Sequence, residues 1–186
     1  MRIVAGHLRG RVITPPESKG TRPTSDKTRE TLFNILQHAD WAPPLENAAI
    51  LDLYAGSGAL ALEALSRGAA SAVLIDMAQS ARRAMRENVD RLGVSDRTEI
   101  LKRDVTRLGA CPETHPSGFD LILCDPPYRK GLAQRALETI SSGDWLAPHG
   151  VVALETAADE EIEDAGWHRH AQRKIGPAML WFLGRS

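Results

Sequence analysis

From residue 49 onward, short apolar runs alternate with stretches in which apolar residues recur at helical spacing. Five short segments predict strands, at residues 50–53, 72–75, 98–101, 119–124 and 151–154. Helices are expected between Gly58 and Gly68 and at about 79–92 and 132–143. The last twenty residues predict two antiparallel strands joined around Gly176–Pro177. Strands that alternate with helices are typical of an α/β fold with a doubly wound, mainly parallel sheet.

Residues 1–40 follow a different pattern, which we interpret as an appendage to a single domain covering residues 1–186. Ile3–Val4 and Val12–Ile13 flank Gly6 and Gly10, and this spacing predicts a short β-hairpin. A helix should follow, capped by Thr24, Ser25 or Asp26. Its apolar positions are Leu32, Ile35, Leu36 and Ala39.

The composition fits one domain that needs no disulfide or metal to fold, since 42% of its 186 residues are hydrophobic. No apolar run approaches the length of a membrane span. One of the two cysteines, Cys124, lies inside an apolar run, which favours a reduced core residue. We therefore expect a cytoplasmic protein without membrane association.

The charges are unevenly distributed along the chain. Residues 1–30 contain seven Lys/Arg and three Asp/Glu, so they carry +4, whereas the remaining residues carry −5. A basic segment on an acidic body indicates either contact with a polyanion or a solvated, unpaired N-terminal region. Composition alone leaves both interpretations open.

The stretch "LDLYAGSGALALEA" predicts a site for a nucleotide-containing cofactor. Gly56 and Gly58 lie between a strand and a helix, with Ala61 completing a GxGxxA pattern. Glycines at such a turn let a ligand approach the backbone at the helix N-terminus. Asp76 ends the next strand, where a carboxylate can hydrogen-bond the hydroxyls of a ribose.

Two further acids bear on the identity of that cofactor. Asp52 precedes the glycine loop, where its charge disfavours a pyrophosphate and suits the cationic amino group of S-adenosylmethionine. Asp104 ends the third strand, where it either accepts a hydrogen bond from the adenine amino group or caps the helical turn that follows. Both roles of Asp104 remain open at this point.

The fourth strand ends in "FDLILCDPPY", where two prolines prevent the sheet ladder from continuing. Asp125 and the carbonyl of Pro126 can accept both N–H bonds of an exocyclic amine on a nucleobase, and the prolines keep these acceptors rigid. The amine is a poor nucleophile because its lone pair is delocalised, so its orientation toward a sulfonium methyl matters. Tyr128 can stack on the base. The alternative is a tight turn with no catalytic role.

In this order, "RPTSDKTRETLFNIL", "LDLYAGSGALALEALSRGA" and "CDPPY" resemble the bacterial small-subunit ribosomal RNA guanine-N2 methyltransferases. The resemblance extends from "RIVAGHLRGR" through "WLAPHGVVALE". The Asp-Pro-Pro-Tyr stretch alone is shared with adenine-N6 and cytosine-N4 DNA methyltransferases. The chain departs from the family at Asp76, where Glu is usual, and at Ala78, where a second acid is common, so a looser ribose contact is expected.

The resemblance implies a Rossmann-like class I S-adenosylmethionine-dependent methyltransferase with a seven-stranded sheet and an antiparallel C-terminal strand. It assigns Gly56, Ser57, Gly58, Asp76 and Asp104 to the S-adenosylmethionine site, and the further candidates there are Asp52, Tyr54, Met77 and Val105. The guanine would be held by Asp125, Pro126, Pro127 and Tyr128. The candidate RNA contacts are Arg9, Arg11, Arg22, Lys27, Arg29, Arg129 and Lys130. No metal site is expected.

The implied reaction transfers a methyl group from S-adenosylmethionine to N2 of a guanine in 16S ribosomal RNA, within a partly assembled small-subunit particle and by a monomer. One alternative is a DNA adenine-N6 or cytosine-N4 methyltransferase, although the chain has no room for the usual target-recognition segment. A second is a catalytically silent RNA-binding assembly factor. A third is a dinucleotide-dependent oxidoreductase.

Overall fold

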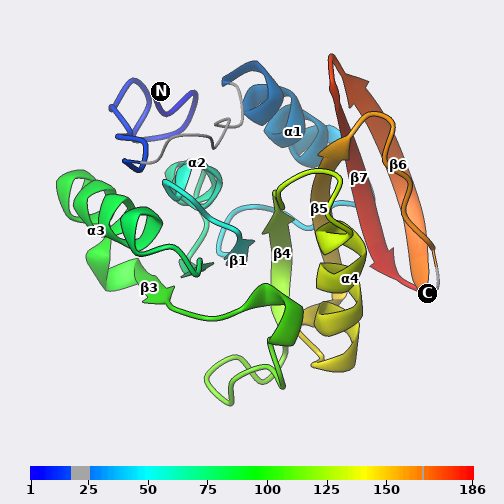
Figure 1. Ribbon diagram of the computed structural model, residues 1–186. Helices are drawn as coiled ribbons and strands as arrows, with labels where there is room; N and C mark the ends of the chain where they lie inside the picture. The colour runs from blue at the N-terminus through cyan, green and yellow to red at the C-terminus, as the bar shows by residue number, and fades with distance from the viewer. Residues whose placement is uncertain (18–25, 165) are drawn as a thin grey trace.

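The computed structural model describes residues 1–17, 26–164 and 166–186, and its centre is a seven-stranded sheet with the order β3-β2-β1-β4-β5-β7-β6 (Figure 1). The strands are β1 (Ala49–Leu53), β2 (Ser71–Ile75), β3 (Thr98–Leu101), β4 (Phe119–Cys124), β5 (Leu146–Ala157), β6 (Trp167–Ile175) and β7 (Ala178–Arg185). Pairing is parallel from β3 through β5, whereas β7 is antiparallel to both β5 and β6. The predicted α/β sheet with an antiparallel C-terminal strand is confirmed.

Helices cover both faces of this sheet. They are α1 (Asp26–His38), α2 (Ala59–Ser66), α3 (Gln79–Leu92) and α4 (Leu132–Ser142), with 3-10 turns η1 (Ser95–Arg97) and η2 (Val105–Arg107). Buried side chains of α1, α2 and α3 share one hydrophobic cluster with one face of the sheet, and those of α4 and η2 share another with the opposite face (Figure 1). This layering is typical of a doubly wound sheet.

Strand β5 is longer than its apolar run of 151–154 predicted, because it begins at Leu146. Pro148 and His149 near its start are exposed, and its register against β4 shifts between Phe119 and Leu121. Such an irregularity interrupts the apolar pattern without ending the strand. The two strands predicted around Gly176–Pro177 are confirmed as β6 and β7.

The N-terminal region forms less regular structure than predicted. The expected hairpin is reduced to an isolated antiparallel bridge between Arg2 and Val12. The predicted helix is α1, which begins at Asp26, so Asp26 is not its cap. The other two candidate caps, Thr24 and Ser25, lie outside the described residues.

The segment predicted as an appendage contributes to the same core as the sheet. Ile3, Leu8, Ile13 and Phe33 are buried in the cluster that also holds Leu62 of α2. The other buried members from residues 1–40 are Leu32 and Leu36. Within the described ranges, no helix has the length and apolar character needed to cross a bilayer.

Candidate active site

Three neighbouring strands, β2, β1 and β4, end at one edge of the sheet, and β5 continues beside them to Ala157. The registers pair Leu53 with both Ile75 and Cys124, and they pair Cys124 with Leu154. The residues that come directly after these four are Tyr54, Asp76, Asp125 and Glu155. Ligands of open α/β sheets bind outside the carboxyl ends of the strands, so this edge is the candidate active site.

The glycine loop between β1 and α2 is held in place by its neighbours. Gly58 has φ +78°, and a Cβ at this position would lie 2.8 Å from Leu74 Cδ2, so only glycine fits without a shift. The amide of Gly56 donates to Asp76 Oδ2 over 3.0 Å. Asn88 Nδ2 donates to the carbonyl of Ser57 over 3.0 Å. The loop is therefore fastened to the end of β2 and to α3, with the N-terminus of α2 at the sheet edge.

Asp52 lies beneath this loop. Its side chain is buried, and Oδ2 accepts a hydrogen bond of 3.0 Å from the amide of Ala61 in α2. Burial raises the pKa of Asp52 to about 8; the Ala61 bond opposes this rise, and the charges of Asp125 and Asp76 add to it.

Two buried polar atoms near the loop lack a hydrogen-bond partner within the described part of the chain. They are Oδ1 of Asp52 and the hydroxyl of Tyr54. Tyr54 also has φ +58°, which is uncommon for a residue with a side chain. Buried polar atoms without partners and strained backbone conformations are often found at ligand-binding sites. The two unpartnered atoms and the conformation of Tyr54 therefore fit a ligand-binding site at this loop.

The raised pKa of Asp52 predicts a pH dependence of stability. The Asp52 carboxyl has its ordinary pKa of 3.8 in the unfolded chain and a pKa of about 8 in the folded protein. Its contribution to the free energy of unfolding is therefore fully present at low pH and is lost as the pH rises toward 8. Asp52→Asn should remove this fall, because the amide is neutral and still accepts from Ala61. Denaturant titrations at pH 6, 7, 8 and 9 should show the wild type losing roughly 1 kcal/mol per pH unit relative to Asp52→Asn below pH 8. If the free energies of unfolding of the wild type and of Asp52→Asn change with pH in the same way, this prediction is wrong.

The remaining residues predicted for the cofactor differ in accessibility. Asp104 caps η2, with Oδ1 accepting from the amide and hydroxyl of Thr106 at 2.9 and 2.8 Å, and these bonds lower its pKa. The capping alternative for Asp104 is thus observed, and an adenine contact would be additional to it. Met77 is 52% exposed, whereas the side chain of Val105 is buried, so Val105 can meet a ligand only through its backbone.

The Asp-Pro-Pro-Tyr stretch turns away from the sheet immediately after β4. The amide of Asp125 donates to the carbonyl of Leu53 over 3.4 Å, which extends the β1–β4 pairing by one residue. Pro126 is buried and Pro127 is exposed. The hydroxyl of Tyr128 donates to Glu155 Oε1. The stretch is therefore anchored to β1 at its start and to β5 at its end.

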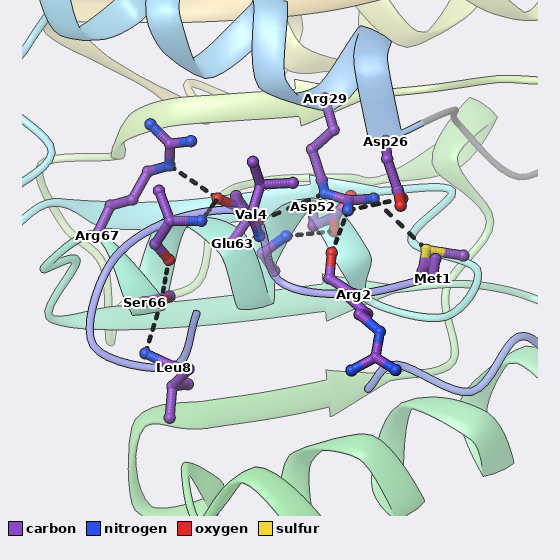
Figure 2. Close-up of polar contacts among 12 residues, drawn as sticks. Met1, Arg2, Val4, Leu8, Asp26, Arg29, Asp52, Glu63, Ser66 and Arg67 are labelled. Carbon is purple, nitrogen blue, oxygen red and sulfur yellow. Dashed lines mark hydrogen bonds and ion pairs between the residues drawn. The ribbon is translucent and has the colours of Figure 1, made fainter. Parts of the chain in front are cut away.

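Arg29, predicted as an RNA contact, is buried, so that prediction is wrong. Its side chain is 0% exposed and descends from α1 into a polar cluster (Figure 2). Nη2 donates to Asp26 Oδ1 over 2.9 Å and to the carbonyl of Arg2, and Nε lies 3.5 Å from Glu63 Oε2. Arg29 thus holds α1 against the N-terminal segment, which we define as residues 1–17.

The other predicted RNA contacts are mostly on the surface. Arg9, Arg11, Lys27 and Lys130 are exposed, as expected of residues that bind phosphates. Arg129 is exposed too, but its guanidinium pairs with Asp159 over 2.9 Å. Arg22 lies outside the described residues.

Glu63 and Ser66 were not identified from the sequence, yet they fasten the N-terminal segment to α2 (Figure 2). Glu63 accepts from the amides of Val4 and Ala5 at 2.8 and 3.0 Å. Ser66 Oγ accepts from the amide of Leu8 at 3.0 Å. Both side chains lie three residues apart on one helix face, and their only sequence signal is that they interrupt an otherwise apolar helix.

Comparison with known proteins places these features in a family. A family model described as conserved hypothetical protein 95 matches residues 1–184. Ribosomal RNA small subunit methyltransferase D of Escherichia coli (strain K12) is 34% identical over 178 residues, which cover 95% of this chain and 85% of that protein. The protein of the same name from Haemophilus influenzae is 32% identical over 163 residues, covering 87% and 81%.

Solved structures share the fold. The structure of yhhF from Escherichia coli has a TM-score of 0.81 at 30% identity and covers 100% of this chain and 98% of its own. An RNA methyltransferase from Salinibacter ruber, solved in complex with S-adenosyl-L-homocysteine, has a TM-score of 0.64 at 15% identity and covers 87% and 92%. The second similarity concerns the fold alone.

Proposed function

The chain belongs to the conserved hypothetical protein 95 family, the family of ribosomal RNA small subunit methyltransferase D, and we propose that it transfers a methyl group from S-adenosylmethionine to N2 of a guanine in 16S ribosomal RNA. One observation carries this proposal. The Asp125–Tyr128 stretch follows β4 directly beside the glycine loop that follows β1. Acceptors for an amine and a cradle for a nucleotide therefore share one edge of the sheet.

The residues that follow β4 have roles that follow from their chemistry. The carboxylate of Asp125 and the carbonyl of Pro126 accept the two N–H bonds of the guanine amine and orient its lone pair. Pro126 and Pro127 restrict the backbone at these acceptors. The ring of Tyr128 stacks on the base, a contact worth about 1–3 kcal/mol. S-adenosylmethionine, when bound, provides the methyl group on a sulfonium.

Observed features of the glycine loop fit this cofactor. Oδ1 of Asp52 is a buried acceptor suited to an ammonium group, and Asp76 is suited to ribose hydroxyls. Oδ2 of Asp76 already accepts from the Gly56 amide, and a carboxylate oxygen has capacity for a second bond. Among the described residues, a Cβ at Gly56 would meet only the carbonyl oxygen of Tyr54, at 3.9 Å, so a ligand can approach the backbone there, and Met77 is exposed next to Asp76.

The RNA would contact exposed basic residues. Arg9, Arg11 and Lys27 are exposed on the N-terminal segment and α1, and Lys130 is exposed just after the Asp125–Tyr128 stretch. Phosphate contacts of this kind fix the position of a substrate without reading its sequence. The target guanine must be unpaired or flipped out, at a cost of a few kcal/mol. We propose a partly assembled small-subunit particle in the cytoplasm as the substrate and a monomer as the active form.

The proposed function predicts the loss of one modified nucleoside. Small-subunit ribosomal RNA from cells that lack this gene should contain one N2-methylguanosine less than RNA from the parent cells, as measured by mass spectrometry of nucleosides. Purified protein should restore it in a tritiated-methyl transfer assay on small-subunit particles, and should not methylate duplex DNA. An unchanged nucleoside profile together with no transfer to particles would support a catalytically silent assembly factor. Stabilisation against heat by NAD instead of S-adenosylmethionine would support an oxidoreductase.

A further inference from the structure

Glu155 occupies the position on β5 that Asp125 occupies on β4. Cys124 and Leu154 are paired in the parallel register, and the two acids come directly after them. Adjacent strands lie about 4.8 Å apart, so the two carboxylates are within reach of one base edge. Glu155 is therefore a second acid at the end where the amine is bound.

The position of Glu155 is well defined. Its side chain is buried, and its backbone lies inside β5, which pairs with β4 on one side and with β7 at Leu180 on the other. The hydroxyl of Tyr128 donates to Oε1. Burying a carboxylate costs folding free energy unless hydrogen-bond donors contact its oxygens. Buried carboxylates are therefore normally found where such donors are available. Tyr128 is one such donor.

The chemistry of the nucleobases explains why a second acceptor is needed here. In adenine and in cytosine, the ring nitrogen beside the exocyclic amine is an acceptor. In guanine, the ring nitrogen N1 beside the N2 amine carries a hydrogen and is a donor. A flipped base is read through this Watson–Crick edge, so a carboxylate beside the amine site matches guanine and repels the other two.

We infer that Glu155 accepts the N1–H of the target guanine and so determines which base is methylated, with Tyr128 orienting its carboxylate. This inference rests on the proposed function, because it assigns a partner to the same base that Asp125 holds. A hydrogen bond from N1–H to a carboxylate also shifts electron density toward the amine, which assists its attack. The step itself is unchanged: the C–S bond of S-adenosylmethionine breaks as the N–C bond forms, which leaves S-adenosylhomocysteine, and one amine proton is released to solvent.

A base analogue tests this role directly. 2-Aminopurine carries the same exocyclic amine as guanine, but its N1 is an acceptor. Small-subunit RNA can be prepared by splinted ligation with either guanine or 2-aminopurine at the target position and reconstituted with small-subunit proteins. The wild type should prefer guanine by roughly 10- to 100-fold in kcat/KM, as expected for one buried hydrogen bond replaced by a repulsive contact. Glu155→Gln, whose amide can donate to N1, should lower this ratio at least about tenfold.

Control variants separate base recognition from a structural role. Glu161→Gln removes an exposed charge near the same strand and should leave the ratio at the wild-type value. Tyr128→Phe keeps the ring but loses the hydroxyl that holds Oε1, so it should lower the ratio by less than Glu155→Gln. If Glu155→Gln lowers activity on both substrates equally, Glu155 only anchors Tyr128 and the inference is overturned.

Failure of the proposed function has a different outcome. A wild type that methylates neither substrate contradicts the proposed function, whereas a wild type that methylates guanine with a ratio unaffected by Glu155→Gln contradicts only the role of Glu155. Melting temperatures with and without S-adenosylmethionine check that each variant is folded. Should Glu155→Gln not fold, the ratio of Tyr128→Phe decides, because an unchanged ratio there would overturn the inference.

Discussion

Replacing Asp125 by alanine is expected to slow methyl transfer by about 10²–10³ while the affinity for S-adenosylmethionine remains nearly unchanged. The side chain lies at the end of β4, beside but not within the glycine loop, and it is proposed to accept one amine N–H. Removing one preorganised hydrogen-bonding group from a reacting centre typically costs about 10²–10³ in kcat. Single-turnover transfer of a tritiated methyl group to small-subunit particles measures the rate, and calorimetry measures the affinity for the cofactor.

Two variants complete this test. Asp125→Asn keeps one carbonyl acceptor and should retain more activity than Asp125→Ala. Asp96→Ala removes an exposed carboxylate from η1, which precedes β3 and therefore lies at the opposite edge of the sheet; it should behave as the wild type. Wild-type turnover by Asp125→Ala would refute the assigned chemistry.

Replacing Glu63 by alanine is expected to cause the largest loss of stability, about 3–5 kcal/mol, because it leaves buried charge without its partner. Glu63 is 0% exposed and lies 3.5 Å from Arg29 and 2.9 Å from Arg67. It also satisfies two amides of the N-terminal segment. The loss is a large fraction of the 5–15 kcal/mol that is usual for a domain, roughly a fifth or more. Urea denaturation of the two proteins measures it.

A surface ion pair provides the matched control for Glu63→Ala. Arg83 and Glu87 pair over 3.0 Å on α3 with side chains that are 71% and 50% exposed. Glu87→Ala should cost about 0.3–0.5 kcal/mol, as is typical of exposed pairs in helices. If both variants lose equally little stability, the buried cluster does not hold the N-terminal segment in the way described.

The central strands β1, β2 and β4 could be predicted from the sequence because they are buried on both faces. The predicted bounds of β3, β4 and α3 are the observed ones; those of β4 follow from an apolar run and those of α3 from helical spacing. Strand β5 was underestimated because Pro148 and Gly150 interrupt its pattern near the start. The hairpin was overestimated because β-branched pairs predict strands even where only one bridge, from Arg2 to Val12, forms.

Residues of the candidate site could be predicted where their type is unusual for their position in the sequence. They could not be predicted where their type is common at such a position. Asp125 stands out because two prolines follow it. Glu155 ends an apolar run in the same way, but Thr156 continues the strand and nothing in the sequence marks the acid as special. Arg29 was misassigned because a charge pattern does not show which basic residues are buried, and only the tertiary contact with Glu63 reveals it.

The close approach of Gly6 to α2 limits how this architecture can be re-engineered. A Cβ at Gly6 would lie 1.8 Å from the carbonyl oxygen of Ser66, so the two backbones touch where the segment crosses the helix. A chimera that carries only residues 1–17 onto another methyltransferase would lack the helix surface that receives them. The transplantable unit is the segment together with the helix beneath it, and that helix starts at the cofactor loop. The RNA contacts proposed for this segment therefore cannot be transferred to another protein without α2.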